Sequence, residues 1–105
     1  MNIHELHDRY SLEAHRLVAK KLLADPGLLD VAKANLTKIG AELPKSSVAV
    51  EEWSVILKCK VESICEFIVQ DNDHLRELRQ SSPFSGIISQ SERDDLRKSI
   101  YSRFT

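Results

Sequence analysis

The sequence predicts a single all-helical domain, a bundle of five to six helices. Apolar side chains recur at i, i+3 and i+4 spacings through most of the chain. The three prolines and three glycines fall between these periodic segments, and no stretch has the strict alternation of a half-buried strand. At 105 residues the chain is long enough for one hydrophobic core, so one helical domain over residues 1–105 is expected.

The first predicted helix begins at Ser11, whose hydroxyl can accept a hydrogen bond from an exposed N–H group of the first turn. An apolar stripe with helical spacing follows it: Leu12, His15, Val18, Ala19 and Leu22. The preceding residues are expected to form a polar segment, with Ile3 and Leu6 docked on the bundle.

The second predicted helix starts at Asp25 and Pro26, because Asp is a good N-cap and Pro at the first helical position loses no needed donor. Gly40 is expected to end it in the left-handed conformation. One face between them is apolar: Leu28, Leu29, Ala32, Leu36 and Ile39. A connection over residues 44–47 follows.

Helical spacing returns over residues 48–70, which form either one long helix or two shorter ones broken near residues 58–60. Its apolar positions are Trp53, Ile56, Leu57, Val61, Ile64, Cys65 and Ile68. Cys59 and Cys65 are six positions apart and cannot face the same way on a helix, so both are expected to be reduced. Cys65 is predicted to be a core residue and Cys59 to be half exposed.

Capping candidates at residues 71–73 precede a short predicted helix bearing Leu75 and Leu78. This helix must end before Pro83, because the residue before a proline avoids the α region. Residues 78–86, LRQSSPFSG, then form a non-helical joint. Ser89 and Glu92 match the capping box S-x-x-E, which predicts a final helix with these apolar positions: Leu96, Ile100, Tyr101 and Phe104.

The charge balance argues against a general affinity for nucleic acid. Lys and Arg number 15 against 16 Asp and Glu, a net charge of -1, so no bulk field attracts nucleic acid or anionic lipid. The first residues lack the basic and apolar regions of a signal peptide, and no apolar run approaches the ~18 residues of a membrane span. A cytoplasmic protein without a membrane partner or a cofactor is expected.

No catalytic or metal site is predicted. His4 and His7 are three positions apart, whereas the metalloprotease motif spaces its histidines by four. Arg9 and His15 resemble the R-x4–6-H element of HEPN ribonucleases, in which the arginine contacts phosphate and the histidine transfers a proton. Tyr10 departs from the small polar residue usual after that arginine. Because such a loose pattern arises easily by chance, it carries little weight, and a small ribonuclease is only the alternative function.

The final predicted helix carries four basic residues that could contact DNA phosphates, as in an operon repressor: Arg93, Arg97, Lys98 and Arg103. Glu92, Asp94 and Asp95 share this helix and would repel phosphates. A solvated face with charge pairs one turn apart is the better explanation of the mixture.

Two roles are open for the joint, residues 78–86. Phe84 and Ile87 could fold back as a plug on the core while Arg79 braces the turn, which is favoured because single loop aromatics are usually buried. Alternatively Phe84 is exposed and contacts a partner. The predicted partner-binding residues are Arg76, Arg79, Gln80, Ser81, Ser82, Pro83 and Phe84.

The run LRELRQSSPFSGII at residues 75–88, followed by SER at residues 91–93, resembles the C-terminal signature of a family of small uncharacterised bacterial proteins. That signature is LRQSSPF-x-G, an apolar pair and an E-R helix start. The similarity extends to residues 12–19, 24–26 and 32–36, and to Trp53. The family often has proline near the position of Lys60, so the helix break expected there is less certain in this chain.

Proteins of this family resemble the smaller partner of two-gene modules, encoded beside a nucleotidyltransferase-like protein in a toxin–antitoxin arrangement. The resemblance implies an antitoxin-like protein that binds and inhibits the neighbouring enzyme. It transfers no catalytic residue to this chain. Association with a second copy of the chain is a further kind of partner left open.

Overall fold

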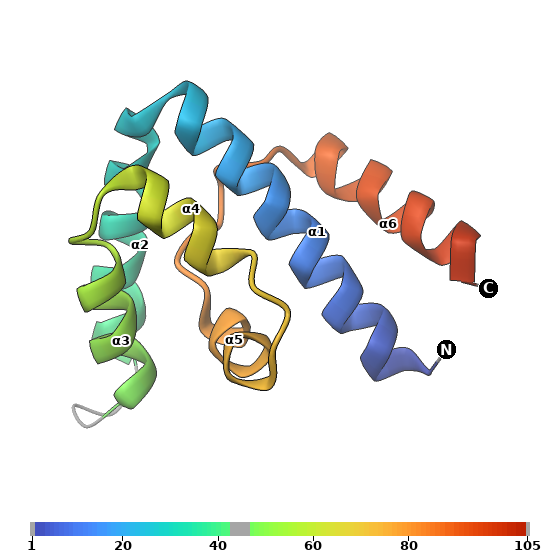
Figure 1. Ribbon diagram of the computed structural model, residues 1–105, viewed down its shortest axis with the longest axis horizontal. Helices are drawn as coiled ribbons and strands as arrows, with labels where there is room; N and C mark the ends of the chain where they lie inside the picture. Colours follow the sequence, from blue (N-terminus) through green and yellow to red (C-terminus); the bar gives the residue numbers. More distant parts are fainter. Residues whose placement is uncertain (1, 43–46, 105) are drawn as a thin grey trace.

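The computed structural model describes residues 2–42 and 47–104, which form six α-helices and no strand (Figure 1). The helices are α1 Ile3–Ala24, α2 Leu29–Glu42, α3 Val48–Ile56, α4 Val61–Ile68, α5 Asp73–Leu78 and α6 Gln90–Phe104. Single 3-10 turns lie before α2, at Pro26–Leu28, and after α5, at Arg79–Ser81. The predicted all-α bundle is confirmed.

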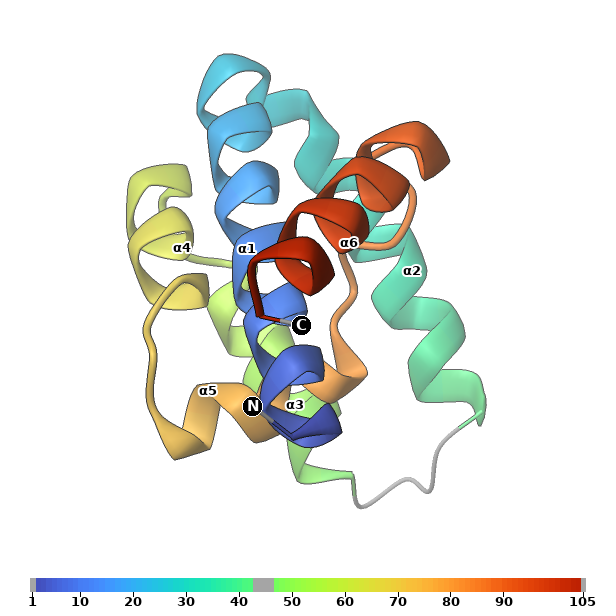
Figure 2. The ribbon, with the colours of Figure 1, turned by 90° about the vertical axis from the view of Figure 1, so that its right-hand side faces the viewer.

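Helix α1 lies along the middle of the molecule, with α4 packed on one side of it and α6 on the other (Figure 2). Helices α2 and α3 pack against each other. Helix α6 has its main contacts with α1 alone, and Ile100 is its fully buried side chain. Leu96 and Tyr101 are half-buried, and the side chain of Phe104 lies outside the described part.

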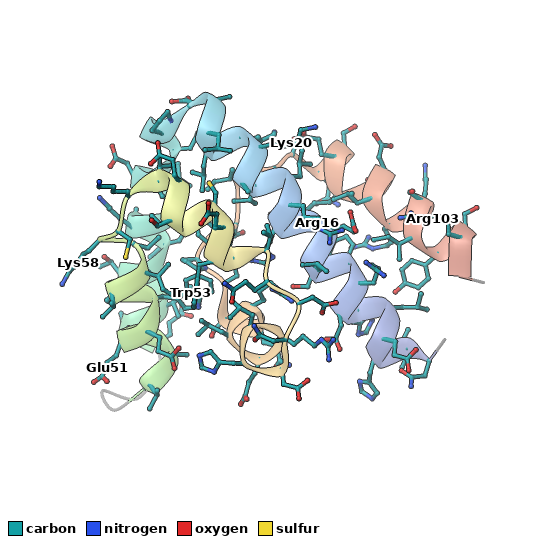
Figure 3. All side chains as sticks on the ribbon, in the orientation of Figure 1. Arg16, Lys20, Glu51, Trp53, Lys58 and Arg103 are labelled. Atoms are coloured by element: carbon teal, nitrogen blue, oxygen red, sulfur yellow. The ribbon has the colours of Figure 1, made fainter. Side chains whose placement is uncertain are left out.

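The core is built around Trp53, which is fully buried. Figure 3 shows Trp53 on the inner side of α3, whereas Glu51 and Lys58 point away from the bundle. The other large side chains with almost no exposure come from five segments: Leu22, Ile64, Ile68, Leu75, Pro83 and Ile100. Both cysteines are free thiols; Cys65 is buried as predicted, whereas Cys59, predicted to be half exposed, is exposed.

The predicted start of the first helix at Ser11 is wrong, because α1 begins eight residues earlier, at Ile3. Asn2 is its N-cap, and the Asn2 side chain accepts a hydrogen bond of 2.9 Å from the backbone N–H of Glu5. Leu6 is buried as predicted, whereas Ile3 is 52% exposed. The apolar stripe itself is confirmed, since all five of its members are buried.

The predicted C-terminal stop at Gly40 is also wrong. Helix α2 continues to Glu42, and among the described residues Gly86 is the one with a positive φ, at 90°. Asp25 is an N-cap as predicted, since its side chain accepts a hydrogen bond of 3.2 Å from the N–H of Gly27. It caps the 3-10 turn Pro26–Leu28, however, and α2 itself begins at Leu29. Residues 44–46 of the predicted connection lie outside the described residues.

The helical stretch over residues 48–70 is broken, which was one of its two predicted forms. Helix α3 ends at Ile56, and α4 begins at Val61 with Lys60 as its N-cap. Backbone N–H groups of Lys58 and Cys59 donate to carbonyls of α3 and close a turn between the helices.

Both predicted caps near the joint are present. The Asn72 side chain accepts a hydrogen bond of 2.9 Å from the N–H of Leu75 and starts α5. Ser89 and Glu92 form the capping box of α6, with distances of 2.8 Å and 3.1 Å. Lys21 pairs with Glu92, so α1 also holds the start of α6.

Alanine substitutions at two glycines should change stability in opposite directions. Gly86→Ala is expected to lower the free energy of unfolding by about 1–2 kcal/mol, because its φ of 90° disfavours any side chain. An added Cβ there would meet no atom within 4 Å, so the loss comes from the backbone. Gly40→Ala lies in a helix, 3.5 Å from Val50, and should raise stability by up to about 1 kcal/mol. Urea unfolding measures the free energy of unfolding of both variants. Equal changes would contradict the positive φ of Gly86 and the helical conformation of Gly40.

Candidate functional site

The predicted partner-binding residues differ in exposure. Arg79 is 4% exposed, Phe84 3% exposed, and Pro83 fully buried. Gln80 is exposed, and the residues with intermediate exposure are Arg76, Ser81 and Ser82. Phe84 and Ile87 thus lie in the core, which confirms the plug and makes the exposed Phe84 interface wrong. In this fold the three buried side chains are not available to a partner.

Phe84 joins two helices through aromatic contacts. Its ring meets the Trp53 ring edge to face with centroids 5.5 Å apart, and the His15 ring in the same geometry at 5.9 Å. Trp53 also donates a hydrogen bond of 3.2 Å from its Nε1 to the carbonyl of Leu78. The joint is thereby fixed between α1 and α3.

Asn35 on α2 holds the joint from a third helix. Its Nδ2 donates to the carbonyl of Pro83 at 2.9 Å and to that of Ser85 at 2.7 Å. Sequence reasoning did not assign this role. The available signal was the residue type, because asparagine is a poor helix former and here lies beside the apolar face of a strong helix.

His15 connects α1 to Ser82 of the joint. Its Nδ1 lies 2.7 Å from the carbonyl oxygen of Ser11, and its Nε2 lies 2.8 Å from Ser82 Oγ. A carbonyl only accepts, so Nδ1 carries the proton and the Ser82 hydroxyl donates to Nε2. Burial lowers the pKa of His15 to about 4, and the histidine is neutral near pH 7.

A serine beside a histidine also occurs in hydrolases, but the details here support a structural role. His15 is a weak base because its pKa is about 4. Its Nδ1 bonds to a backbone carbonyl, whereas hydrolases orient the ring with a carboxylate. Ser82 Oγ also accepts a hydrogen bond of 3.3 Å from the N–H of Phe84. The pair therefore fastens the joint to α1.

Arg79 braces the turn, as the sequence predicted. Its Nη1 donates to the carbonyls of Ile68 at 3.1 Å and Gln70 at 2.8 Å, at the C-terminal end of α4. Its Nε and Nη2 are buried and have no hydrogen-bond partner among the described residues. Burial lowers the pKa of Arg79 from its ordinary value.

Arg76 on α5 binds two carboxylates at the start of that helix. It lies 2.9 Å from Asp71 and 3.0 Å from Asp73. The hydrogen bond from Arg76 lowers the pKa of Asp71. Arg76 thus orders the start of α5, and its half-exposed side chain is still open to further contacts.

Arg9 and His15 do not meet in one site. Arg9 lies 3.6 Å from Glu13 and lines a cavity together with Asp8 and Asp71. His15 lines a different cavity. The two side chains leave α1 in different directions, so their spacing does not place them around one phosphate.

The cavity that includes His15 lies between α1, the joint and α6, and we call it the α1–α6 cavity. It measures about 300 Å³. Its polar lining residues include Tyr10, His15, Ser85, Arg93 and Arg97. Two of the four basic residues of the final helix thus contribute to it, whereas Lys98 and Arg103 do not line it.

A second hollow, which we call the α3–α4 groove, lies between α3 and α4 and measures about 580 Å³. Its lining is mainly apolar: Val55, Ile56, Cys59, Ile64 and Phe67, together with Glu51, Glu52 and Ser63. Val55 is 64% exposed. Sequence reasoning did not identify this groove, because Val55 lies off the apolar stripe that formed the core.

The described residues include no group of three or more His, Cys, Asp or Glu side chains that could hold a metal ion. No described helix is both long and apolar enough to cross a membrane. Comparison of the chain with protein-family models, curated proteins and solved structures finds no match. Function is therefore inferred from the α1–α6 cavity and the α3–α4 groove.

Proposed function

We propose that this chain is a protein-binding module that binds and inhibits an enzyme encoded beside it, as an antitoxin does. The observation that supports this best is the α3–α4 groove, where Val55 is 64% exposed, Cys59 is exposed and Phe67 is half-buried. Contiguous apolar surface of this kind is typical of interaction sites. The sequence resemblance adds a nucleotidyltransferase-like protein as the proposed partner.

Charge indicates which kind of segment fits the groove. The two charged residues that line it, Glu51 and Glu52, are both acidic, and Glu62 and Glu66 are exposed on α4. A helix of the partner with an apolar face and basic flanks complements this surface. The apolar side chains would give affinity, and the basic ones would favour encounter with this face.

The joint contributes to this proposal indirectly. Trp53 binds the Leu78 carbonyl and fixes α3, and Arg79 binds the Ile68 carbonyl and fixes the end of α4. These are the two helices that form the groove. Inhibition would be steric, by covering the substrate entrance of the enzyme, and needs an interface of about 1,000 Å² or more.

Co-expression with the product of the adjacent gene tests the proposal. The two proteins should co-purify, and expression of both should restore growth that the enzyme alone inhibits. Val55→Lys should weaken binding by roughly 30-fold or more, because it places a charge among the apolar contacts. Val31→Lys is the matched control on α2, outside the groove, and should change affinity by less than about threefold.

Failure to associate, with no restoration of growth, would refute the proposal. Equal loss of affinity in both lysine variants would exclude the groove as the interface. A concentration-dependent dimer that Val55→Lys dissociates would make a second copy the occupant instead. The alternative of a ribonuclease needs RNA cleavage that His15→Ala abolishes, and the separation of Arg9 from His15 gives it no support.

A further inference from the structure

The α1–α6 cavity has a different charge from the rest of the chain. Of the described residues that line it, the two with a formal charge at neutral pH are Arg93 and Arg97, and none is acidic. The whole chain carries 16 acidic residues against 15 basic ones. The cavity is therefore a local positive site on a protein of nearly balanced charge.

Arg93 is half-buried and lacks a counter-charge. No described carboxylate forms an ion pair with it, and its Nη2 lies 3.5 Å from the hydroxyl of Ser85. Arg16 and Arg76 differ, since Arg16 lies 2.6 Å from Glu13 and Arg76 lies 2.9 Å from Asp71. A partly desolvated guanidinium without a counter-charge is stabilised when an anion binds.

Arg97 can approach the same anion as Arg93. The two are four residues apart on α6, a spacing that places side chains on one face of a helix. Arg97 lies over the ring of Tyr10, 5.4 Å from its centroid, and 3.8 Å from Asp94. The ring fixes the guanidinium at the cavity, while Asp94 offsets part of its charge.

The inner part of the cavity is apolar. Val18, Phe84 and Ile88 close its floor and are almost fully buried. Tyr10 and Ala14, which are half-buried, supply the more open surface. A volume of about 300 Å³ is at the lower end of small-molecule sites, which is enough for an organic group attached to an anion. The site thus combines a cationic entrance with an apolar inner wall.

We propose that the α1–α6 cavity binds a small phosphate monoester, with the phosphate between Arg93 and Arg97 and an apolar or aromatic body against Tyr10 and Ala14. Two guanidiniums match the charge of about -1.5 to -2 and the three acceptor oxygens of a phosphate better than a carboxylate. The Ser85 hydroxyl, which lies beside Arg93, can donate to a phosphate oxygen. No residue of the cavity lines the α3–α4 groove, so this proposal does not depend on the proposed function.

Titration with phenyl phosphate, followed by nuclear magnetic resonance, tests the site. Resonances of Ser85, Phe84 and Arg93 should shift, with an affinity at least about tenfold higher than for inorganic phosphate or for phenol alone. Arg93→Gln should weaken binding about tenfold or more. Lys98→Gln removes the same charge from an exposed position of α6 outside the cavity, and should change affinity less than about twofold.

Asp94→Asn removes the carboxylate that pairs with Arg97 and should tighten binding several-fold. Equal weakening by Arg93→Gln and Lys98→Gln would overturn the proposal, because it would show unspecific attraction. Equal affinity for inorganic and phenyl phosphate would show that the cavity binds the anion alone and not a monoester. Absence of any resonance shift in the cavity at about 10 mM phenyl phosphate would show that it is not a binding site. If Arg93→Gln does not fold, Arg97→Gln, with a side chain 54% exposed, serves as the same test.

Discussion

Phe84→Ala is expected to lower the free energy of unfolding by about 3–5 kcal/mol. The ring is 3% exposed and contacts the rings of both Trp53 and His15. Alanine would leave a cavity between α1 and α3 that the surrounding helices can close only in part. Since domains of this size have about 5–15 kcal/mol of stability, the variant should unfold at much lower urea concentration. Circular dichroism during urea titration measures the loss.

Phe84→Leu is the matched control for this substitution. Leucine keeps most of the buried volume and loses the two aromatic contacts, so the expected loss is smaller, about 1–3 kcal/mol. A loss below about 1 kcal/mol in Phe84→Ala would contradict the buried position of the ring. The joint would then again be a candidate interface.

The local features of the fold follow from the sequence where short-range chemistry determines them. The Asn72 cap, the Ser89–Glu92 capping box and the end of α5 before Pro83 depend on neighbours within a few residues. The start of α1 has such a signal too, since Asn2 and Glu5 have the spacing of a cap and its partner. The prediction that Ser11 is the N-cap was wrong, because a serine inside a helix cannot be distinguished from a capping serine by its residue type.

The α1–α6 cavity and the α3–α4 groove could not be predicted from short-range chemistry, because each depends on how segments of the chain pack in the fold. His15 and Ser82 are 67 residues apart, and Asn35 and Pro83 are 48 apart. Arg93 was correctly placed on a charged helix, but its lack of a carboxylate partner is a property of the folded arrangement. The α3–α4 groove likewise exists only because the chain turns back between Ile56 and Val61.

The joint sequence LRQSSPFSG is explained mostly by the fold. Arg79 closes the end of α4, and Ser82 donates to His15. Pro83 and Phe84 are buried, and Gly86 adopts a φ of 90°. Gln80 is exposed and makes no such contribution. The sequence run that carries the resemblance therefore connects four helices of the fold: α1, α2, α3 and α4.

Acidification from about pH 6.5 to about pH 4 should lower the free energy of unfolding by roughly 3 kcal/mol through His15 alone. In the folded protein burial lowers the pKa of His15 to about 4, whereas in the unfolded chain the histidine titrates near 6.5. Between these values the unfolded state binds a proton that the folded state does not. Stability from this group is therefore complete above pH 6.5 and is lost as the pH falls.

Urea unfolding at pH 7 and pH 4.5, compared between the parent and His15→Gln, measures this contribution. Glutamine cannot be protonated, so the variant should start less stable and lose less on acidification. The lowered pKa values of Asp71 and Glu92 contribute in both proteins and cancel in the comparison. Parallel pH profiles would show that His15 binds its proton as easily in the folded state as in the unfolded chain, and would contradict the effect of burial on its pKa.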